Sequence, residues 1–239
     1  MTKKIILLFV EGPTDEDTLA LIFSKLIKEQ NIEFEVMHGD LTASEDITVK
    51  YIEVSIQEKV AEYLRKNPFI TINDILKVVQ IIDTDGAFVS GAQIVQSSSD
   101  QTKYCETHIE ARDKNRLMRR NISKRSIVHH LMKLKKLKKT DILQQSIPYE
   151  IYYFSRNLEH VLHNVSGSLS DEEKEELAFE FADYYNTHPE EFLEFLYNGE
   201  FHVPGDYDET WKFIMDNGNS LKRYCNLSNF FERLGITKK

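Results

Sequence analysis

The sequence predicts an α/β protein with a mostly parallel sheet flanked by helices and a C-terminal all-helical appendage. An unbroken apolar run at 5–10, and a second run at 78–82 that only Gln80 interrupts, are rich in branched residues and are typical of strands buried on both faces of a parallel sheet. Segments with helical periodicity separate such runs, and helix-capping patterns follow one another toward the C-terminus. We therefore divide the chain into an α/β domain, residues 1–165, and an acidic helical domain, residues 166–239.

The first predicted strand, Ile5 to Val10, ends abruptly at an acidic residue. Glu11 follows the apolar run directly, and Gly12 and Pro13 prevent the strand from continuing. Thr14 is a good N-cap, and acidic residues occupy the first turn of a helix that we expect to run to about residue 28. Glu11 is therefore expected at the carboxyl end of a parallel strand.

A second strand and a crossover helix are predicted next. Phe34 to Met37 has strand-like alternation, and Asp40 and Asp46 lie in the loop that follows. For these two acids a solvated loop position is favoured over a place in a site. Ile52 to Lys66 carries apolar residues at helical spacing, which predicts the helix that returns the chain to the next parallel strand.

The run from Val78 to Ile82 repeats the pattern of an apolar strand that ends in acids. Asp83 and Asp85 are two residues apart, so in an extended segment both carboxylates point to the same side. Ligands of open α/β sheets bind just beyond the carboxyl ends of strands. We therefore expect Glu11, Asp83 and Asp85 to share one crevice.

A polar stretch and a basic stretch follow this strand. Residues 87–107 are predicted to form a mobile loop or insertion beside the crevice. Residues 112–139 carry twelve Lys and Arg against one acid, with a helix expected from about Ser123. A solvated surface helix is one interpretation, and a surface that tracks a phosphate backbone is the other. The candidate nucleic-acid-binding residues are Arg116, Arg119, Arg120, Lys124, Lys135, Lys136, Lys138 and Lys139.

The last predicted strand, Ile151 to Phe154, leads into a helix that starts near Asn157. Glu159 lies in the first turn of that helix, where it either stabilises the helix dipole or joins the acidic site. Beyond it, residues 169–216 hold fifteen Asp and Glu against two Lys, with aromatic residues at helical spacing. These aromatic residues are expected to form the core of the helical appendage.

The two strand-then-acid motifs resemble those of the Toprim domain. Val10-Glu11-Gly12-Pro13-Thr14-Asp15-Glu16, followed by Ile82-Asp83-Thr84-Asp85, is most similar to the OLD-family Toprim nucleases, over roughly the first two thirds of the chain. The resemblance implies a divalent-metal-dependent nuclease with Glu11, Asp83 and Asp85 as catalytic residues. It also implies that the same three residues, with Glu159 after the late strand, are metal ligands.

The ligand chemistry agrees with this resemblance. Crowded carboxylates raise one another's pKa unless a cation neutralises them, and ligand sets made only of oxygen select Mg²⁺ or Mn²⁺. Asp83 and Asp85 would hold the ion that polarises the phosphodiester, and Glu11 would bind a metal or act as general acid or base. Asp15 is assigned to helix capping, and Glu159 to a second ion.

Two other functions remain open. OLD-like proteins are often paired with an ATPase in bacterial anti-phage defence, and this chain has no GxxxxGK[ST] phosphate loop. It would then be a latent or non-catalytic regulatory subunit, with the ATPase or a second copy of itself as protein partner. A nucleotidyl transferase of primase type is disfavoured because no zinc-binding cysteine cluster is recognised.

Composition suggests a cytoplasmic protein that is not embedded in a membrane. No stretch approaches the eighteen or so apolar residues of a membrane span. The two cysteines, Cys105 and Cys225, form no CxxC pair and are not recognised at Cys/His ligand spacing, which indicates free thiols in a reducing compartment. The net charge of −9 hides a strongly basic segment and a strongly acidic one, so it does not exclude nucleic acid as a partner.

Overall fold

The computed structural model describes residues 4–27, 32–38, 41–42 and 47–237, and within them a five-stranded sheet forms the centre of the molecule. Its strand order is β2-β1-β3-β8-β7. The first four strands run parallel, and β7 is antiparallel to β8. The expected mostly parallel sheet is thereby confirmed. The strands are β1 (Lys4–Val10), β2 (Ile32–His38), β3 (Ile75–Asp83), β7 (Lys136–Leu137) and β8 (Ile147–Phe154).

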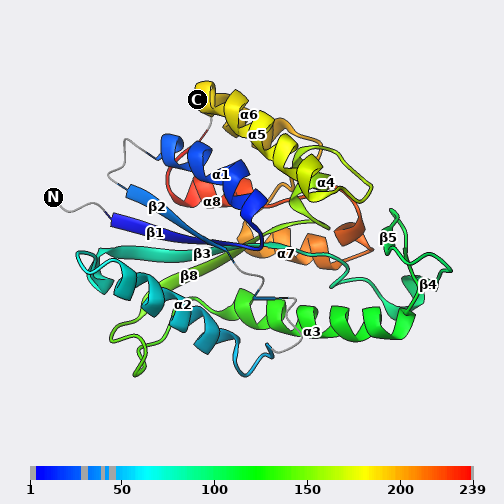
Figure 1. Cartoon of the computed structure of the whole chain (residues 1–239), viewed down its shortest axis with the longest axis horizontal. Helices are drawn as coiled ribbons and strands as arrows, with labels where there is room; N and C mark the ends of the chain where they lie inside the picture. The colour runs from blue at the N-terminus through cyan, green and yellow to red at the C-terminus, as the bar shows by residue number, and fades with distance from the viewer. Residues whose placement is uncertain (1–3, 28–31, 39–40, 43–46, 238–239) are drawn as a thin grey trace.

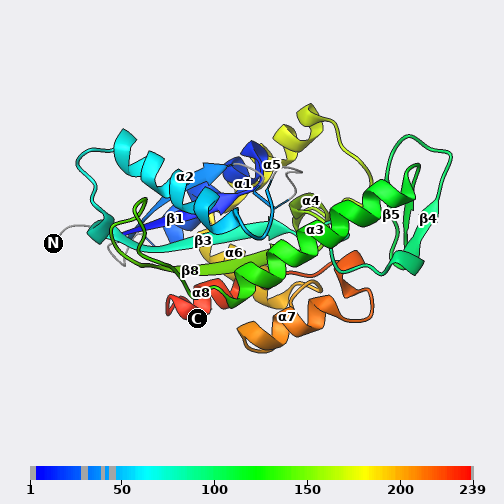
Figure 2. The same cartoon turned by 90° about the horizontal axis from the view of Figure 1, so that it is seen from below.

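Helices cover both faces of this sheet (Figures 1 and 2). On one face lie α1 (Pro13–Leu26), α5 (Asp171–Thr187), α6 (Pro189–Asn198) and α8 (Leu227–Arg233); on the other lie α2 (Ile52–Lys66) and α3 (Lys114–Lys133). The short α4 (Leu158–Leu162) follows β8 in the chain. The helix α7 (Tyr207–Met215) lies beside β8. Three short 3₁₀ helices span Ile72–Asp74, Gly91–Gln93 and Asn219–Leu221. Within the described residues, no helix is both long and apolar enough to cross a membrane.

The C-terminal helices share the core of the sheet. Phe23 of α1 stacks on Phe230 of α8 with ring centroids 5.7 Å apart, and Phe230 also packs edge-on against Tyr152 of β8. Phe192 of α6 contacts Phe23 as well. The described helices α5, α6 and α8 therefore belong to a layer that covers the sheet, and this continuous core corrects the expected separate appendage.

The free edge of β8 is covered by α7 and the segment after it. β7 pairs only with the start of β8, at Ile147 and Pro148. Farther along, Tyr207 Oη donates to the Ile151 carbonyl at 2.9 Å, and the Tyr153 amide donates to Asn226 Oδ1 at 2.9 Å. Buried polar groups of the strand edge are thus satisfied by side chains, which also prevents pairing with another strand there.

A second, three-stranded sheet replaces the mobile loop expected at 87–107. Its strands, β4 (Ile94–Gln96), β5 (Lys103–Tyr104) and β6 (Ile109–Ala111), lie in the order β4-β6-β5. Ile94 and Ile109 pack with Leu117 of α3 in a small core of their own. Residues 87–107 thus lie in an insertion, the other expected alternative, and its strands went unpredicted because strands of two or three residues are too short to display a period of two.

The basic segment also differs from expectation. α3 begins at Lys114, where Asp113 Oδ1 accepts a hydrogen bond from the Arg116 amide at 2.8 Å, and it ends at Lys133. The predicted helix from Ser123 to residue 139 is wrong because Lys136 and Leu137 pair with β8 instead. This pairing gives hydrogen-bond partners to backbone groups at the edge of β8, which a longer α3 would have left unpaired.

Candidate functional site

Three neighbouring strands deliver their acidic residues to one edge of the sheet. β1, β3 and β8 are adjacent and parallel, so their carboxyl ends meet. The loops after β3 and β8 are joined by hydrogen bonds from the Thr84 amide to the Phe154 carbonyl at 2.8 Å and from the Asp85 amide to the Arg156 carbonyl at 2.9 Å. These bonds hold the segment that bears Asp85 beside the one that leads to Glu159.

A lysine from α3 bridges two of these carboxylates. Lys124 Nζ lies 2.6 Å from Asp85 Oδ2 and 3.1 Å from Glu11 Oε1. Thr42 Oγ1 donates a further hydrogen bond to Glu11 Oε1 at 2.7 Å. Glu11 and Asp85, which are distant in the sequence, therefore lie on either side of one nitrogen atom.

The position of Lys124 corrects its assignment to a phosphate-binding surface. Only 1% of the residue is exposed, because it lies on the same face of α3 as the buried Asn121, Val128 and Leu131. Burial lowers the pKa of Lys124, but Asp85 and Glu11 outweigh burial, so the pKa lies above its usual value and the side chain stays charged. Lys124 is thus an internal cation of the acidic site.

Asp83 and Asp15 lie among these groups, and their surroundings raise the pKa of both carboxyl groups. Burial, followed by Glu11, Asp15 and Asp85, raises the pKa of Asp83 well above its usual value. Burial is also the main cause that raises the pKa of Asp15 to about 6, although its Oδ2 accepts a hydrogen bond from the Gly12 amide at 2.9 Å. Asp15 therefore caps its helix, as expected, and also belongs to the acidic cluster.

Glu159 completes the cluster from the far side. It is 6% exposed in the first turn of α4, where the Asn157 side chain caps the helix. Lys174 Nζ, from α5, lies 3.2 Å from Glu159 Oε1. Glu159 raises the pKa of Asp15 and Lys174 lowers it, so this ion pair lies close to Asp15. The Lys174–Glu159 ion pair and the Lys124 bridge therefore flank one shared group of carboxylates.

The donor set fits a divalent cation. We call Glu11, Asp15, Asp83, Asp85 and Glu159 the carboxylate cluster. Among the described residues, two ammonium groups, those of Lys124 and Lys174, form ion pairs with it, so its five carboxyl groups outnumber the lysines that contact them. All donors are oxygen atoms, which is the ligand type of Mg²⁺ and Mn²⁺. Burial, and after it the neighbouring carboxylates, raises the pKa values of Asp83 and Asp15, and a bound cation would favour their ionised forms.

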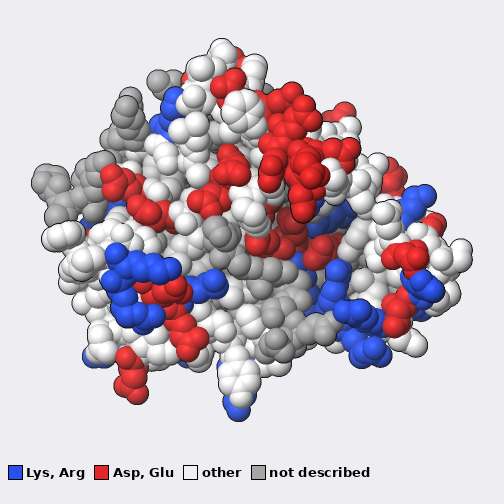
Figure 3. Space-filling model, viewed as in Figure 1, with Lys and Arg blue, Asp and Glu red and all other residues white. Residues whose placement is uncertain are grey.

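A cleft of about 500 Å³ opens beside the carboxylate cluster. Figure 3 shows basic and acidic side chains side by side in a hollow between the acidic upper layer and the small sheet. The charged residues of its lining are Asp85, Lys103, Glu110, Arg156, Glu159 and Lys174. Arg156 packs over the ring of Tyr104, 5.5 Å from its centroid, and its buried Nε has no hydrogen-bond partner among the described residues. The cleft therefore offers cations as well as carboxylates to a phosphate-bearing ligand.

The other predicted basic residues divide into two groups. Arg116 and Arg119 are exposed near the small sheet, and Arg120 Nη2 donates to Tyr104 Oη at 2.9 Å. Lys135, Lys136, Lys138 and Lys139 are exposed at the other end of α3, by the start of β8. Because a 20-residue helix is about 30 Å long, one continuous basic surface beside the site is not formed.

Sequence reasoning missed three contributors to the site. Asp15 was assigned mainly to helix capping, and the family motif left a supporting role beside the metal ligands open. Lys174 stands alone in an acidic run, and Arg156 in a short loop, so neither carried a signal of its own. Asp40 and Asp46 lie outside the described residues.

Comparison with known proteins gave no match to a family model, to a curated protein or to a solved structure.

Proposed function

We propose that the chain is a divalent-metal-dependent endonuclease that hydrolyses phosphodiester bonds in DNA or RNA, with a site resembling that of the OLD-family Toprim nucleases. One observation supports this most: carboxylates from three adjacent strand ends crowd beside a cleft with more negative charge than the lysines in contact with them neutralise. Mg²⁺ or Mn²⁺ is the cofactor that this donor set favours.

The roles follow from position. Asp83 and Asp85 end the central strand of the cluster, so they are the proposed main metal ligands, with Glu11 and Glu159 on either side. A bound divalent ion would supply Lewis-acid polarisation of the phosphodiester and a water of lowered pKa. Glu11 is the candidate general base. Its carboxylate is oriented by hydrogen bonds that it accepts from Thr42 and Lys124.

The cations of the site have a separate role. Lys124 fixes Glu11 and Asp85 in place, so their carboxylates are oriented before any ligand arrives. Arg156 lines the cleft with a guanidinium that matches phosphate oxygens, and Lys174 lies on the same wall. These groups would position the substrate backbone and offset its charge.

A latent subunit of an ATPase complex is the second candidate. It is favoured by the ion pairs that Lys124 and Lys174 make with three members of the carboxylate cluster, since the isolated chain already satisfies part of that charge internally. An ATPase or a second copy of the chain would then release the site. Both functions use the same residues, and a nucleotidyl transferase would also need them.

Cleavage by the purified chain distinguishes these functions. Labelled plasmid, single-stranded DNA and total tRNA are incubated with Mg²⁺, Mn²⁺ or EDTA, using the wild type, Asp83→Asn and the exposed control Asp141→Asn. A nuclease cleaves at least one substrate with metal, loses that activity in Asp83→Asn, and keeps it in Asp141→Asn. Metal binding without cleavage of any substrate would favour the latent subunit, and cleavage that survives EDTA would exclude the proposed chemistry.

A further inference from the structure

The hairpin formed by β5 and β6 places three potential metal ligands on one face. The Cys105 amide donates to the His108 carbonyl at 2.9 Å, which closes a tight turn over residues 105–108. Lys103 pairs with Glu110, and Tyr104 pairs with Ile109. Because side chains alternate along strands, Tyr104 and Ile109 face the small core, and Cys105, His108 and Glu110 share the opposite face.

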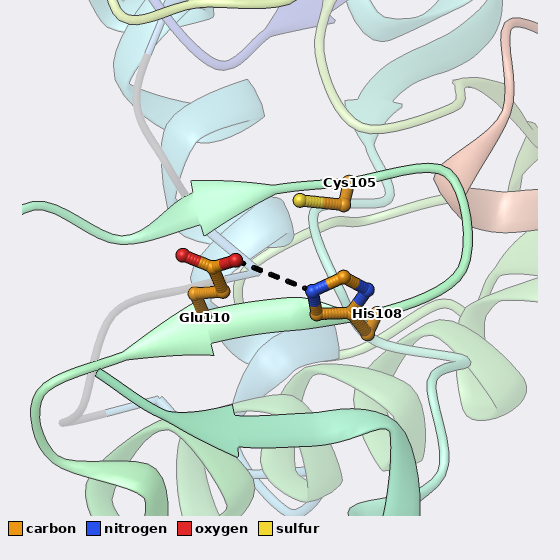
Figure 4. Close-up of side chains that lie close together, drawn as sticks. All are labelled: Cys105, His108 and Glu110. Atoms are coloured by element: carbon orange, nitrogen blue, oxygen red, sulfur yellow. Dashed lines mark hydrogen bonds and ion pairs between the residues drawn. The ribbon is translucent and has the colours of Figure 1, made fainter.

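Figure 4 shows the three side chains pointing toward one another across the hairpin. One ligand atom from each of Cys105, His108 and Glu110 lies within 4.8 Å of the other two, and all three residues are half-buried. His108 Nε2 lies 3.3 Å from Glu110 Oε1 (Figure 4). The atoms are therefore already gathered around one point, at separations that a small bound cation could bridge.

The second ring nitrogen of His108 has a partner of its own. Thr107 Oγ1 lies 3.1 Å from His108 Nδ1. A hydroxyl that accepts the Nδ1 proton leaves Nε2 free to bind a metal, and metal-binding histidines are usually oriented by such a bond. The turn thus supplies the ligand and, in Thr107, a hydroxyl that can accept the Nδ1 proton when Nε2 binds a metal.

We propose that Cys105, His108 and Glu110 form a Zn²⁺ site that clasps this hairpin. A thiolate, an imidazole and a carboxylate are the donors that zinc takes, whereas Mg²⁺ and Mn²⁺ prefer oxygen alone. Three protein ligands leave a fourth tetrahedral position for water. On binding, zinc replaces the thiol proton of Cys105, which passes to solvent.

The zinc site is separate from the carboxylate cluster but borders the same cleft. Glu110, Lys103 and Tyr104 all line that cleft, and Tyr104 holds Arg120 and packs on Arg156. A metal that ties Cys105 to Glu110 joins the two strands across their turn and so fixes the wall that carries Tyr104. The sequence already contains a Cys-x-x-His spacing, in which His108 follows Cys105 by three residues. The statement that the cysteines lack a Cys/His ligand spacing was therefore wrong.

Cobalt substitution tests the proposal without relying on activity. The metal-free wild-type chain is titrated with Co²⁺, and thiolate-to-cobalt charge-transfer absorption is recorded, which only a cysteine ligand produces. We expect the band to appear at one equivalent, to disappear on addition of Zn²⁺, and to persist in Asp83→Asn. Absence of the band in the folded wild type would overturn the proposal and leave an ordinary His–Glu ion pair.

Alkylation of Cys105 provides a second readout. Bound Zn²⁺ should slow the alkylation of Cys105, which is measured by mass spectrometry. Cys225 is buried and should remain unmodified with or without metal. His108→Gln and Cys105→Ser should abolish zinc protection and the cobalt band respectively, and the exposed His188→Gln is the matched control. Thr107→Val should weaken zinc affinity about 10- to 100-fold. Equal protection in His108→Gln and in the wild type would also refute the site.

Discussion

Lys124 Nζ lies 2.6 Å from Asp85 Oδ2, and this ion pair between a buried lysine and a half-buried aspartate connects the middle of α3 to the carboxyl end of the central strand. A buried pair contributes little net stability, because both charges lose their hydration. Removing one partner is costly, since the other is then left buried and uncompensated. The lysine therefore matters to the acidic site chiefly through the charge that it balances.

Lys124→Met should destabilise the metal-free protein by less than the about 3–5 kcal/mol that breaking a fully buried ion pair costs, because Glu11 and Asp85 keep part of their contact with water. Methionine keeps most of the length of the side chain but leaves Glu11 and Asp85 to repel each other. Added Mn²⁺ should recover more stability in this variant than in the wild type. The measurement is urea unfolding with and without metal, and Lys133→Met, exposed on the same helix, is the control. Equal midpoints for the variant and the control would contradict this role.

Asp83→Asn and Asp85→Asn should both abolish cleavage but should differ in stability. Asparagine at 83 removes a carboxyl group whose ionised form is disfavoured by burial and by Glu11, Asp15 and Asp85, so the metal-free protein should melt at a higher temperature. Asparagine at 85 also removes the ion pair with Lys124, so the melting temperature should fall. Thermal melting beside a cleavage assay checks both effects, and wild-type cleavage by either variant would end its assignment as a catalytic residue.

Asp15 predicts a pH dependence of stability. Its folded-state pKa of about 6 lies above its unfolded value, so the folded protein holds the proton more tightly. This group therefore costs no stability at low pH and an increasing amount as pH rises from about 4 to about 6. Asp15→Asn removes this cost but also alters the helix cap, which adds a constant offset. The difference in unfolding free energy between variant and wild type should therefore grow with pH across that window. A difference that is flat with pH would disprove the raised pKa.

The two ends of α3 should differ in nucleic-acid binding. Arg116→Gln with Arg119→Gln should weaken binding of all sequences alike and reduce its salt dependence, because these residues lie near the cleft. Neutralising Lys136, Lys138 and Lys139, at the far end, should have a smaller effect. Binding of single-stranded and duplex probes at several salt concentrations makes the comparison. The opposite ranking would place the phosphate-binding surface at the start of β8.

The shared core predicts one cooperative unfolding transition for the whole chain. Phe231→Ala should cost about 3–5 kcal/mol, because the ring is fully buried between α1, α6 and α8. Phe179→Ala, on α5 with 73% of the residue exposed, is the control and should change stability little. Fluorescence and circular dichroism should give coincident curves. Two separated transitions would restore residues 166–239 as an independent domain.

The sequence predicted the parts of the molecule that carry strong local signals. Runs such as Ile5–Val10 predicted the parallel strands, and the acids that follow them predicted which edge of the sheet holds Glu11 and Asp85. The role of Lys124 could not be predicted, because it depends on which face of α3 meets the sheet. The helix was expected to start at about Ser123, but it starts nine residues earlier, at Lys114, so Lys124 lies in its middle and not in its first turn.

The single helix α3 touches three parts of the molecule. Leu117 packs under the small sheet, Lys124 reaches the carboxylate cluster, and His130 Nε2 lies 2.8 Å from Glu53 Oε1 of α2. Because α3 is one unbroken helix, it holds these three contacts at fixed spacings along its axis. A shift of the small sheet along the axis of α3 would therefore carry Lys124 in the same direction, relative to Glu11 and Asp85.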